Sequence, residues 1–98
     1  MEHYSVDTYV LDVLLPDLVG HDHKPGAFLV YLCLLSASER GKTASLTLSL
    51  QDLAARTGLA KSTVQGAIRH LKRRGLLDAD VVASTTQPIR RIKKPWVR

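Results

Sequence analysis

Hydrophobic positions along the chain recur at helical spacing in several stretches. In residues 5–19, apolar side chains at positions 6, 9, 10, 13 and 14 predict a helix that Ser5 would cap. Pro16 would end or kink this helix near Leu15, unless an extended start gives way to a short helix beginning at Pro16. Residues 25–39 are apolar on nearly every side and are followed by Gly41 as a stop. This pattern predicts a central helix that its neighbours cover.

Two further helices are predicted over residues 50–57 and 61–74. Ser49 and Asp52 have the spacing of a capping box at the start of the first. Gly58 supplies the residue of positive φ that ends it. The second helix has one apolar face, made of Val64, Ala67, Ile68 and Leu71. Its opposite face is polar and basic, so the helix is expected to lie at the surface.

Short alternating segments predict a small amount of β-structure. Residues 45–49 alternate between polar and apolar side chains and read as a short strand. "LLDADVV" (76–82) and "PIRRIKK" (88–94) flank a polar loop, which predicts a β-hairpin. Ile89 and Ile92 are three positions apart and cannot share a face of a regular strand. A bulge or an early strand end would resolve the register.

The two helices over residues 50–74 meet the steric needs of a helix-turn-helix. A small residue is needed where the helices cross, and Ala54 supplies it. The turn needs Gly58 for its positive φ and an apolar Leu59 to fill the corner. Val64 and Ile68 point back at the first helix and anchor the second. All these residues fall at the spacing of a helix-turn-helix.

The segment "SLQDLAARTGLAKSTVQGAIRHLKRRGLL", residues 49–77, resembles the winged helix-turn-helix family of bacterial DNA-binding regulators. The residues that match the family pattern, in order, are Ala54, Gly58, Ser62, Thr63, Leu71, Gly75 and Leu76. The resemblance extends more loosely over about residues 25–95. It implies a mainly α fold with a small β-hairpin (α+β), in which a three-helix core carries a wing. On this basis residues 25–98 form the DNA-binding domain, and residues 1–24 are an extra N-terminal helical segment.

Two positions depart from the family pattern. Ala60 stands where many members have a Ser or Thr that caps the second helix, a contact worth about 1 kcal/mol. Gly66 stands where many have a large polar residue, and it lowers helix propensity by up to about 1 kcal/mol relative to Ala. These departures bear on which residues contact DNA more than on the fold.

The resemblance implies a recognition helix at about residues 61–74 in the major groove and a wing at residues 82–94 on the DNA backbone. Gln pairs with adenine and Arg with guanine through two hydrogen bonds each, and hydroxyls near a helix start suit phosphate as well as bases. The base-reading candidates are Ser62, Thr63, Gln65 and Arg69. The candidates for backbone contacts are Lys61, Lys72, Arg73, Arg90, Arg91, Lys93 and Lys94. The alternative to DNA binding is a basic helix that only faces solvent, followed by a disordered tail that increases solubility.

Charge is distributed unevenly along the chain. The net charge is +5, yet residues 1–23 contain five acids and no Lys or Arg, whereas residues 24–98 contain all 14 Lys and Arg. This asymmetry indicates that the basic part of the chain faces a polyanion and that the acidic N-terminal part faces away from it. The apolar face of the N-terminal segment suits a homodimer, or it packs on its own domain.

Composition narrows the class of protein. The lone Cys33 excludes an internal disulfide framework and favours a reducing compartment, with Cys33 a small core residue. The longest apolar run, residues 27–35, is too short to span a bilayer, and the start lacks the features of a secretory signal. We therefore expect a soluble, cytoplasmic, nucleoid-associated protein. Tyr31 and Trp96 are expected to pack within the domain.

No cofactor, metal or catalytic site is predicted. "HDH" at residues 21–23, even with His3, matches no structural zinc pattern, and His70 is expected at the surface near phosphate. No phosphate-binding Gly-rich loop or nucleophile–base pair is present, and no small-molecule effector is evident. The prediction is therefore a duplex-DNA-binding transcriptional regulator and not an enzyme. A plasmid or phage replication or partition factor, or a winged-helix module that binds an acidic protein, is the alternative.

Overall fold

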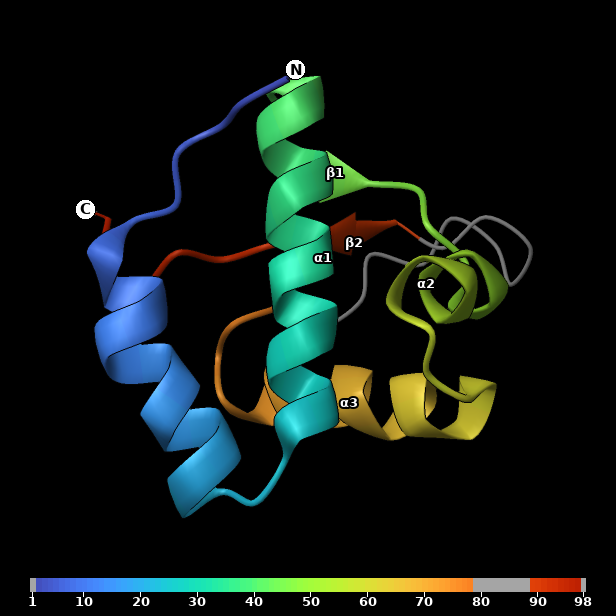
Figure 1. Cartoon of the computed structure of the whole chain (residues 1–98). Helices are drawn as coiled ribbons and strands as arrows, with labels where there is room; N and C mark the ends of the chain where they lie inside the picture. Colours follow the sequence, from blue (N-terminus) through green and yellow to red (C-terminus); the bar gives the residue numbers. More distant parts are fainter. Residues whose placement is uncertain (1, 79–88, 98) are drawn as a thin grey trace.

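The computed structural model describes residues 2–78 and 89–97. The elements of the described residues are, in chain order, η1 (Val10–Leu14), η2 (Pro16–His21), α1 (Pro25–Gly41), β1 (Ser45–Leu46), α2 (Leu50–Thr57), α3 (Lys61–Arg73) and β2 (Arg90–Arg91). In Figure 1, α1 runs through the middle of the molecule with the N-terminal helical segment beside it. The α3 helix crosses behind the start of α1, and α2 lies to the other side.

The hydrophobic core is centred on α1, as its all-round apolar pattern predicts. Tyr31, Val30 and Leu34 of this helix are completely buried against Leu53 of α2 and Leu71 of α3. Burial raises the pKa of Tyr31, whose hydroxyl donates a 2.8 Å hydrogen bond to the Lys93 carbonyl. This bond ties the centre of the core to the C-terminal segment.

The N-terminal segment differs from the prediction at Ser5 and at Pro16. Asp7, rather than Ser5, caps the helical segment, because its side chain accepts a 2.9 Å hydrogen bond from the Tyr9 amide. The helix does not end near Leu15, since η1 and η2 follow one another with only that residue between them. Both are π-helical, and Pro16 is tolerated because it occupies the first turn of η2, where no amide donor is needed.

The N-terminal segment packs on its own domain. Val10, Leu14 and Leu18 are buried and form one stripe against the core. At the other end of the chain, the Trp96 ring stacks on Tyr9 with centroids 5.0 Å apart. The two ends of the described chain therefore support each other, and Trp96 has the packing role expected of it.

The helix predicted over residues 25–39 is two residues shorter than α1. Gly41 is the last helical residue, and Lys42 adopts the left-handed conformation with φ 51°. The Lys42 amide and the Thr43 amide both donate to the Ser38 carbonyl. Since this carbonyl is satisfied twice, the helix ends without a glycine in the left-handed position.

The strands form a small antiparallel sheet. β2 pairs with β1, placing Ser45 opposite Arg91 and Leu46 opposite Arg90. On its other edge, Leu77 pairs with Ile92, which confirms the predicted approach of the two hairpin segments near their base. The predicted strand over residues 45–49 is shorter than expected. Residues 79–88, which include the predicted loop and part of the wing, lie outside the described residues.

The two isoleucines of the hairpin occupy different environments. Ile92 is buried, whereas Ile89 is half-buried, in agreement with the expectation that they do not share one regular face. Ile92 also donates its amide to the Ala44 carbonyl at 2.9 Å. The C-terminal strand therefore lies between the segments at residues 44–46 and 76–78.

Candidate nucleic-acid interface

The turn between α2 and α3 is built by local hydrogen bonds. Ser49 accepts the Asp52 amide and Asp52 accepts the Ser49 amide, both at 3.0 Å, so the predicted capping box is present. These hydrogen bonds lower the pKa of Asp52, the contact with the Ser49 amide most of all. At the other end Gly58 has φ 78°, and the Leu59 amide donates to the Thr57 hydroxyl. The turn chemistry is that predicted from the sequence.

α3 is held against α1 and α2 by the apolar face that the sequence predicted. The buried residues of this face are Val64, Ala67, Ile68 and Leu71. Ala60 is extended and makes no side-chain cap, so the start of α3 leaves its first amides uncapped by that residue. Gly75 has φ 72° and turns the chain toward the sheet.

One face of α3 points away from the core and carries most of the predicted DNA contacts. At about 100° per residue, Ser62, Arg69 and Arg73 lie opposite the buried face. Gln65 and then Lys61 lie to one side of them, toward the buried face, and all five side chains are exposed. Within the part of the chain that the structure describes, Lys61, Arg69 and Arg73 make no ion pair or hydrogen bond with another side chain. They are therefore available to an external anion.

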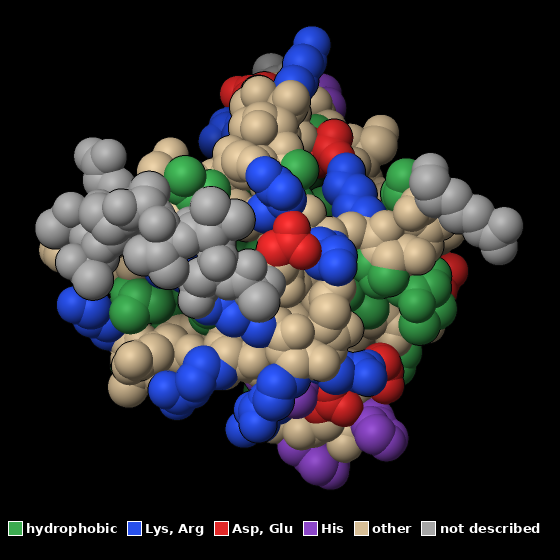
Figure 2. All heavy atoms as spheres, turned by 180° about the vertical axis from the view of Figure 1, so that it is seen from behind, with side chains coloured by type: hydrophobic (Ala, Val, Ile, Leu, Met, Phe, Trp, Pro, Cys, Tyr) green, Lys and Arg blue, Asp and Glu red, His purple; other side chains and the backbone are tan. Residues whose placement is uncertain are grey.

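The molecule seen from behind is rich in basic side chains. Figure 2 shows Lys and Arg residues across this face with few acidic ones between them. This is the side on which α3 lies relative to α1 (Figure 1). A surface of this sign attracts the phosphates of a nucleic acid.

Thr63 lies on the flank of α3 that meets α1. A Cβ atom added at Gly26 would lie 3.1 Å from the Thr63 methyl group, so the two helices approach closely here. A hollow of about 290 Å³ beside this contact is lined by Lys24, Gly66 and neighbouring residues. Thr63 is exposed, but it sits at the edge of the outward face rather than at its centre.

Lys24 is a candidate contact that sequence reasoning missed. It precedes α1 and lines the hollow together with Thr63 and Gly66, so an exposed cation from another element borders the outward face of α3. Only the three-dimensional packing of α1 on α3 brings it there. The single sequence signal was its place as the first Lys or Arg of the chain, next to the predicted start of a helix.

Replacing Gly66 by Ala is expected to stabilise the protein. A Cβ atom there would meet nothing within 4 Å, and the residue is in ordinary helical conformation. The free energy of unfolding should rise by about 0.5–1 kcal/mol, and the melting temperature by about 4–8 °C per kcal/mol. Thermal denaturation followed by circular dichroism measures this. Gly58→Ala is the control and should destabilise, since Gly58 has positive φ. An equal effect of both substitutions would contradict this reading.

The sequence of the C-terminal segment contains basic residues and no acids. In the structure these basic residues nevertheless have acidic neighbours. Arg91 and Lys93 lie 3.9 and 3.5 Å from Asp78, and Lys94 lies 2.7 Å from Glu39. These acids come from distant segments that the linear cluster does not contain. Arg91 and Lys93 remain more than half exposed, whereas Lys94 is half-buried.

Arg90 and Lys72 are also engaged within the protein. The Arg90 side chain donates a 2.6 Å hydrogen bond to the Leu48 carbonyl, and Lys72 is half-buried. Of the predicted backbone contacts, Lys61, Arg73, Arg91 and Lys93 are thus the most exposed. Residues 82–88 of the predicted wing lie outside the described residues.

His70 and Arg74 are bound to the acidic N-terminal segment. His70 Nε2 lies 2.8 Å from Asp22 Oδ2, and only 15% of the His70 side chain is exposed, so His70 is not the surface residue that the sequence predicted. Arg74 contacts Asp17 and also Asp22, the latter at 3.0 Å. The C-terminal end of α3 is therefore fixed to the segment that precedes α1. The charge of Arg74 is neutralised within the protein.

Stability is expected to fall when the pH drops below about 4. Hydrogen bonds from His21 and then His70 lower the pKa of Asp22 below its ordinary value of about 4. The carboxylate therefore favours the folded state above that pH and loses this contribution as pH falls through its lowered pKa. Urea denaturation at a series of pH values should show a smaller acid-side loss in Asp22→Asn than in wild type. Asp12→Asn, at an exposed position, should behave like wild type. Equal pH profiles for Asp22→Asn and wild type would contradict the assignment.

The same cluster contains groups of the kind that bind metals. Donor atoms of Asp17, His21 and Asp22 lie within 4.8 Å of one another. Arg74 contacts both carboxylates, so a cation already lies where a metal ion would need to bind. The arrangement is accounted for as an ion-pair network.

The sequence predicted Cys33 to be a small core residue. In the structure Cys33 lies at the edge of the core. It is half-buried on the front of α1. Burial nevertheless raises the pKa of its thiol, which is therefore neutral at physiological pH.

Two helices joined by a left-handed turn, a third helix packed across them and a small antiparallel sheet define a winged helix-turn-helix fold. A family model described as a helix-turn-helix domain matches residues 24–77, more than half of the 98 residues. The chain belongs to this helix-turn-helix domain family, which indicates DNA binding. Searches of curated proteins and of solved structures gave no significant match. Among residues 2–78 and 89–97, every helix is too short or too polar to cross a membrane.

Proposed function

We propose that this protein binds duplex DNA with sequence preference and regulates transcription. The observation that carries the proposal is the outward stripe of α3, in which Lys61, Gln65, Arg69 and Arg73 recur every four residues. The three cations have no partner within the described residues, while Gln65 and Arg69 can each form two hydrogen bonds to a base. A purely solvated helix would have no reason to exclude acids from this stripe.

The proposed docking places the outward face of α3 in the major groove. Ser62, Gln65 and Arg69 then face base edges, while Lys61 and Arg73 at the two ends of α3 contact phosphates. Arg91 and Lys93 face the adjacent backbone, and Thr63 and Lys24 contact the strand nearest α1. Lys72, Arg90 and Lys94 are assigned supporting roles because they are already engaged or half-buried.

The protein is proposed to act as a homodimer through its N-terminal segment. Leu11, Val13 and Leu15 are 36–54% exposed, although the opposite side of the segment is buried. Such a dimer would address two half-sites about 34–36 Å apart, or a multiple of that distance.

Selection of bound sequences from a random duplex pool at physiological salt tests the proposed function. A regulator of this kind should enrich one motif, and a dimer should enrich a palindrome or a pair of repeats. If binding occurs without enrichment of any sequence, the protein is architectural rather than a specific regulator. Failure to retain duplexes at all would favour a module that binds an acidic protein.

A further inference from the structure

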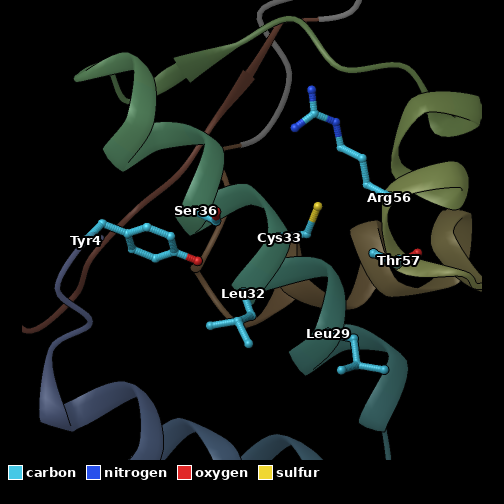
Figure 3. A pocket seen from close by; sticks show the side chains of 7 residues that line it. All are labelled: Tyr4, Leu29, Leu32, Cys33, Ser36, Arg56 and Thr57. Carbon is cyan, nitrogen blue, oxygen red and sulfur yellow. The ribbon is translucent and has the colours of Figure 1, made fainter. Parts of the chain in front are cut away.

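The front of α1 carries a hollow that the DNA-binding surface does not use. Its volume is about 380 Å³, within the range of about 300–1,000 Å³ typical of small-molecule sites. Leu29, Leu32 and Cys33 form an apolar floor, Tyr4 forms one wall, and Arg56 and Thr57 form the other (Figure 3). None of the residues that line it belongs to α3.

The floor of the hollow is apolar and accessible. Leu29 and Tyr4 are both 44% exposed, although most large apolar side chains of the described chain are covered. The Cys33 thiol adds a neutral, weakly polar group beside them. A hydrophobic molecule placed here would remove this apolar surface from water, which favours binding.

Arg56 is the single charged side chain that lines the hollow. Figure 3 shows its side chain extending from the end of α2 into the space above Cys33. Within residues 2–78 and 89–97, the Arg56 guanidinium forms no hydrogen bond or ion pair. A planar guanidinium beside an apolar floor matches a carboxylate attached to an apolar body.

We propose that this hollow binds a small molecule that joins a carboxylate to a compact apolar group. The carboxylate pairs with the Arg56 guanidinium, and the apolar group covers Leu29, Leu32 and Cys33. The ligand also contacts Thr57, whose hydroxyl donates to the Leu53 carbonyl at 2.7 Å and accepts the Leu59 amide at 3.2 Å. It thus lies against the residue that holds the turn before α3.

The test uses the whole ¹⁵N-labelled protein without DNA, so its outcome is independent of the proposed function. Benzoate, phenylacetate and hexanoate are titrated separately, each against its neutral amide, and backbone amide signals are followed by NMR. At least one carboxylate should shift the signals of residues 29–36 and 56–59, at least about tenfold more tightly than its amide.

Three variants test whether the ligand binds in the hollow, and their spectra show whether each variant is folded. Arg56→Gln should abolish the preference for carboxylate over amide, and Ser36→Leu should block both by filling the hollow. Lys42→Gln removes an exposed cation at the far end of α1 and should leave the titrations unchanged. The unperturbed signals of each variant show whether it is folded.

Three results would overturn the proposal. The first is the absence of carboxylate binding up to about 10 mM, beyond the range of weak fragment affinities. The second is equal binding of carboxylates and amides. The third is a shift of the same signals with protein concentration alone, which would assign the hollow to a second copy of the chain.

Discussion

Replacing Lys61, Arg69 and Arg73 together by glutamine should weaken binding to any DNA duplex by at least about 60-fold at 0.1 M salt. Each phosphate contact contributes about 0.9 to the slope of log K against log salt, which is about eightfold per contact at this concentration. The two phosphate contacts, Lys61 and Arg73, therefore multiply to about 60-fold, and the slope should fall by about 1.8. Loss of the Arg69 base contact lowers the affinity further on duplexes that carry its preferred base. Fluorescence anisotropy with a labelled duplex over a range of salt concentrations measures both quantities.

A matched variant separates the position of the charges from their number. Arg40 and Lys42 lie at the end of α1, and Arg56 of α2 lines the hollow beside Cys33, so none of them belongs to α3. Their replacement by glutamine changes the net charge by the same amount. This control should lose far less affinity than the α3 variant and keep most of the salt slope. If the two triple variants weaken binding equally, the effect is one of overall charge and the outward face of α3 is not the interface.

Replacing Ile68 by Ala should lower the stability of the protein strongly. Ile68 is 4% exposed and packs against the core that joins α3 to α1 and α2. Truncation removes buried methyl groups and leaves a cavity, which together lower the free energy of unfolding by about 2–5 kcal/mol. Urea denaturation followed by circular dichroism measures the change.

The opposite pattern is expected for Arg69, which follows Ile68: it should matter for DNA affinity and not for stability. Arg69→Ala should change the free energy of unfolding by less than about 0.5 kcal/mol, because the side chain is exposed and unpaired among the described residues. It should instead reduce DNA affinity, whereas folded Ile68→Ala retains it. Loss of affinity by both variants at temperatures where both are folded would argue against the assignment of inward and outward faces.

The parts of the fold that the sequence predicts correctly are those set by neighbouring residues. The Ser49–Asp52 capping box and the left-handed Gly58 depend on contacts within a few positions, so their residue types suffice. Pro16 shows the limit of this reasoning. Its usual effect is to end a helix, but here it begins a second π-helical segment that packing on α1 stabilises.

The partners of the charged residues could not be predicted from the sequence. Arg74 and His70 look like parts of a basic helix, yet they bind Asp17 and Asp22, about fifty positions away. In the same way Glu39 lies beside Lys94 and removes part of the charge assigned to the wing. The cations of the α3 stripe differ, because Lys61, Arg69 and Arg73 form no ion pair among the described residues.

The Gly66 position illustrates a related point. Its low helix propensity was visible in the sequence, but whether a side chain would fit there was not. The structure places it beside the hollow between Lys24 and Thr63 with open space above its Cα. Packing inside the protein therefore does not require glycine at position 66. Any requirement for glycine there must come from a ligand that binds this face.

The most direct test of the central claim compares the duplexes selected by wild type and by Arg69→Ala from one random pool. If α3 reads bases through its outward face, wild type should enrich a motif. Arg69→Ala should lose discrimination at one base position, by about 1–3 kcal/mol, and keep the rest. A motif identical in both selections would show that Arg69 does not read a base, and contradict the proposed docking of α3 in the major groove.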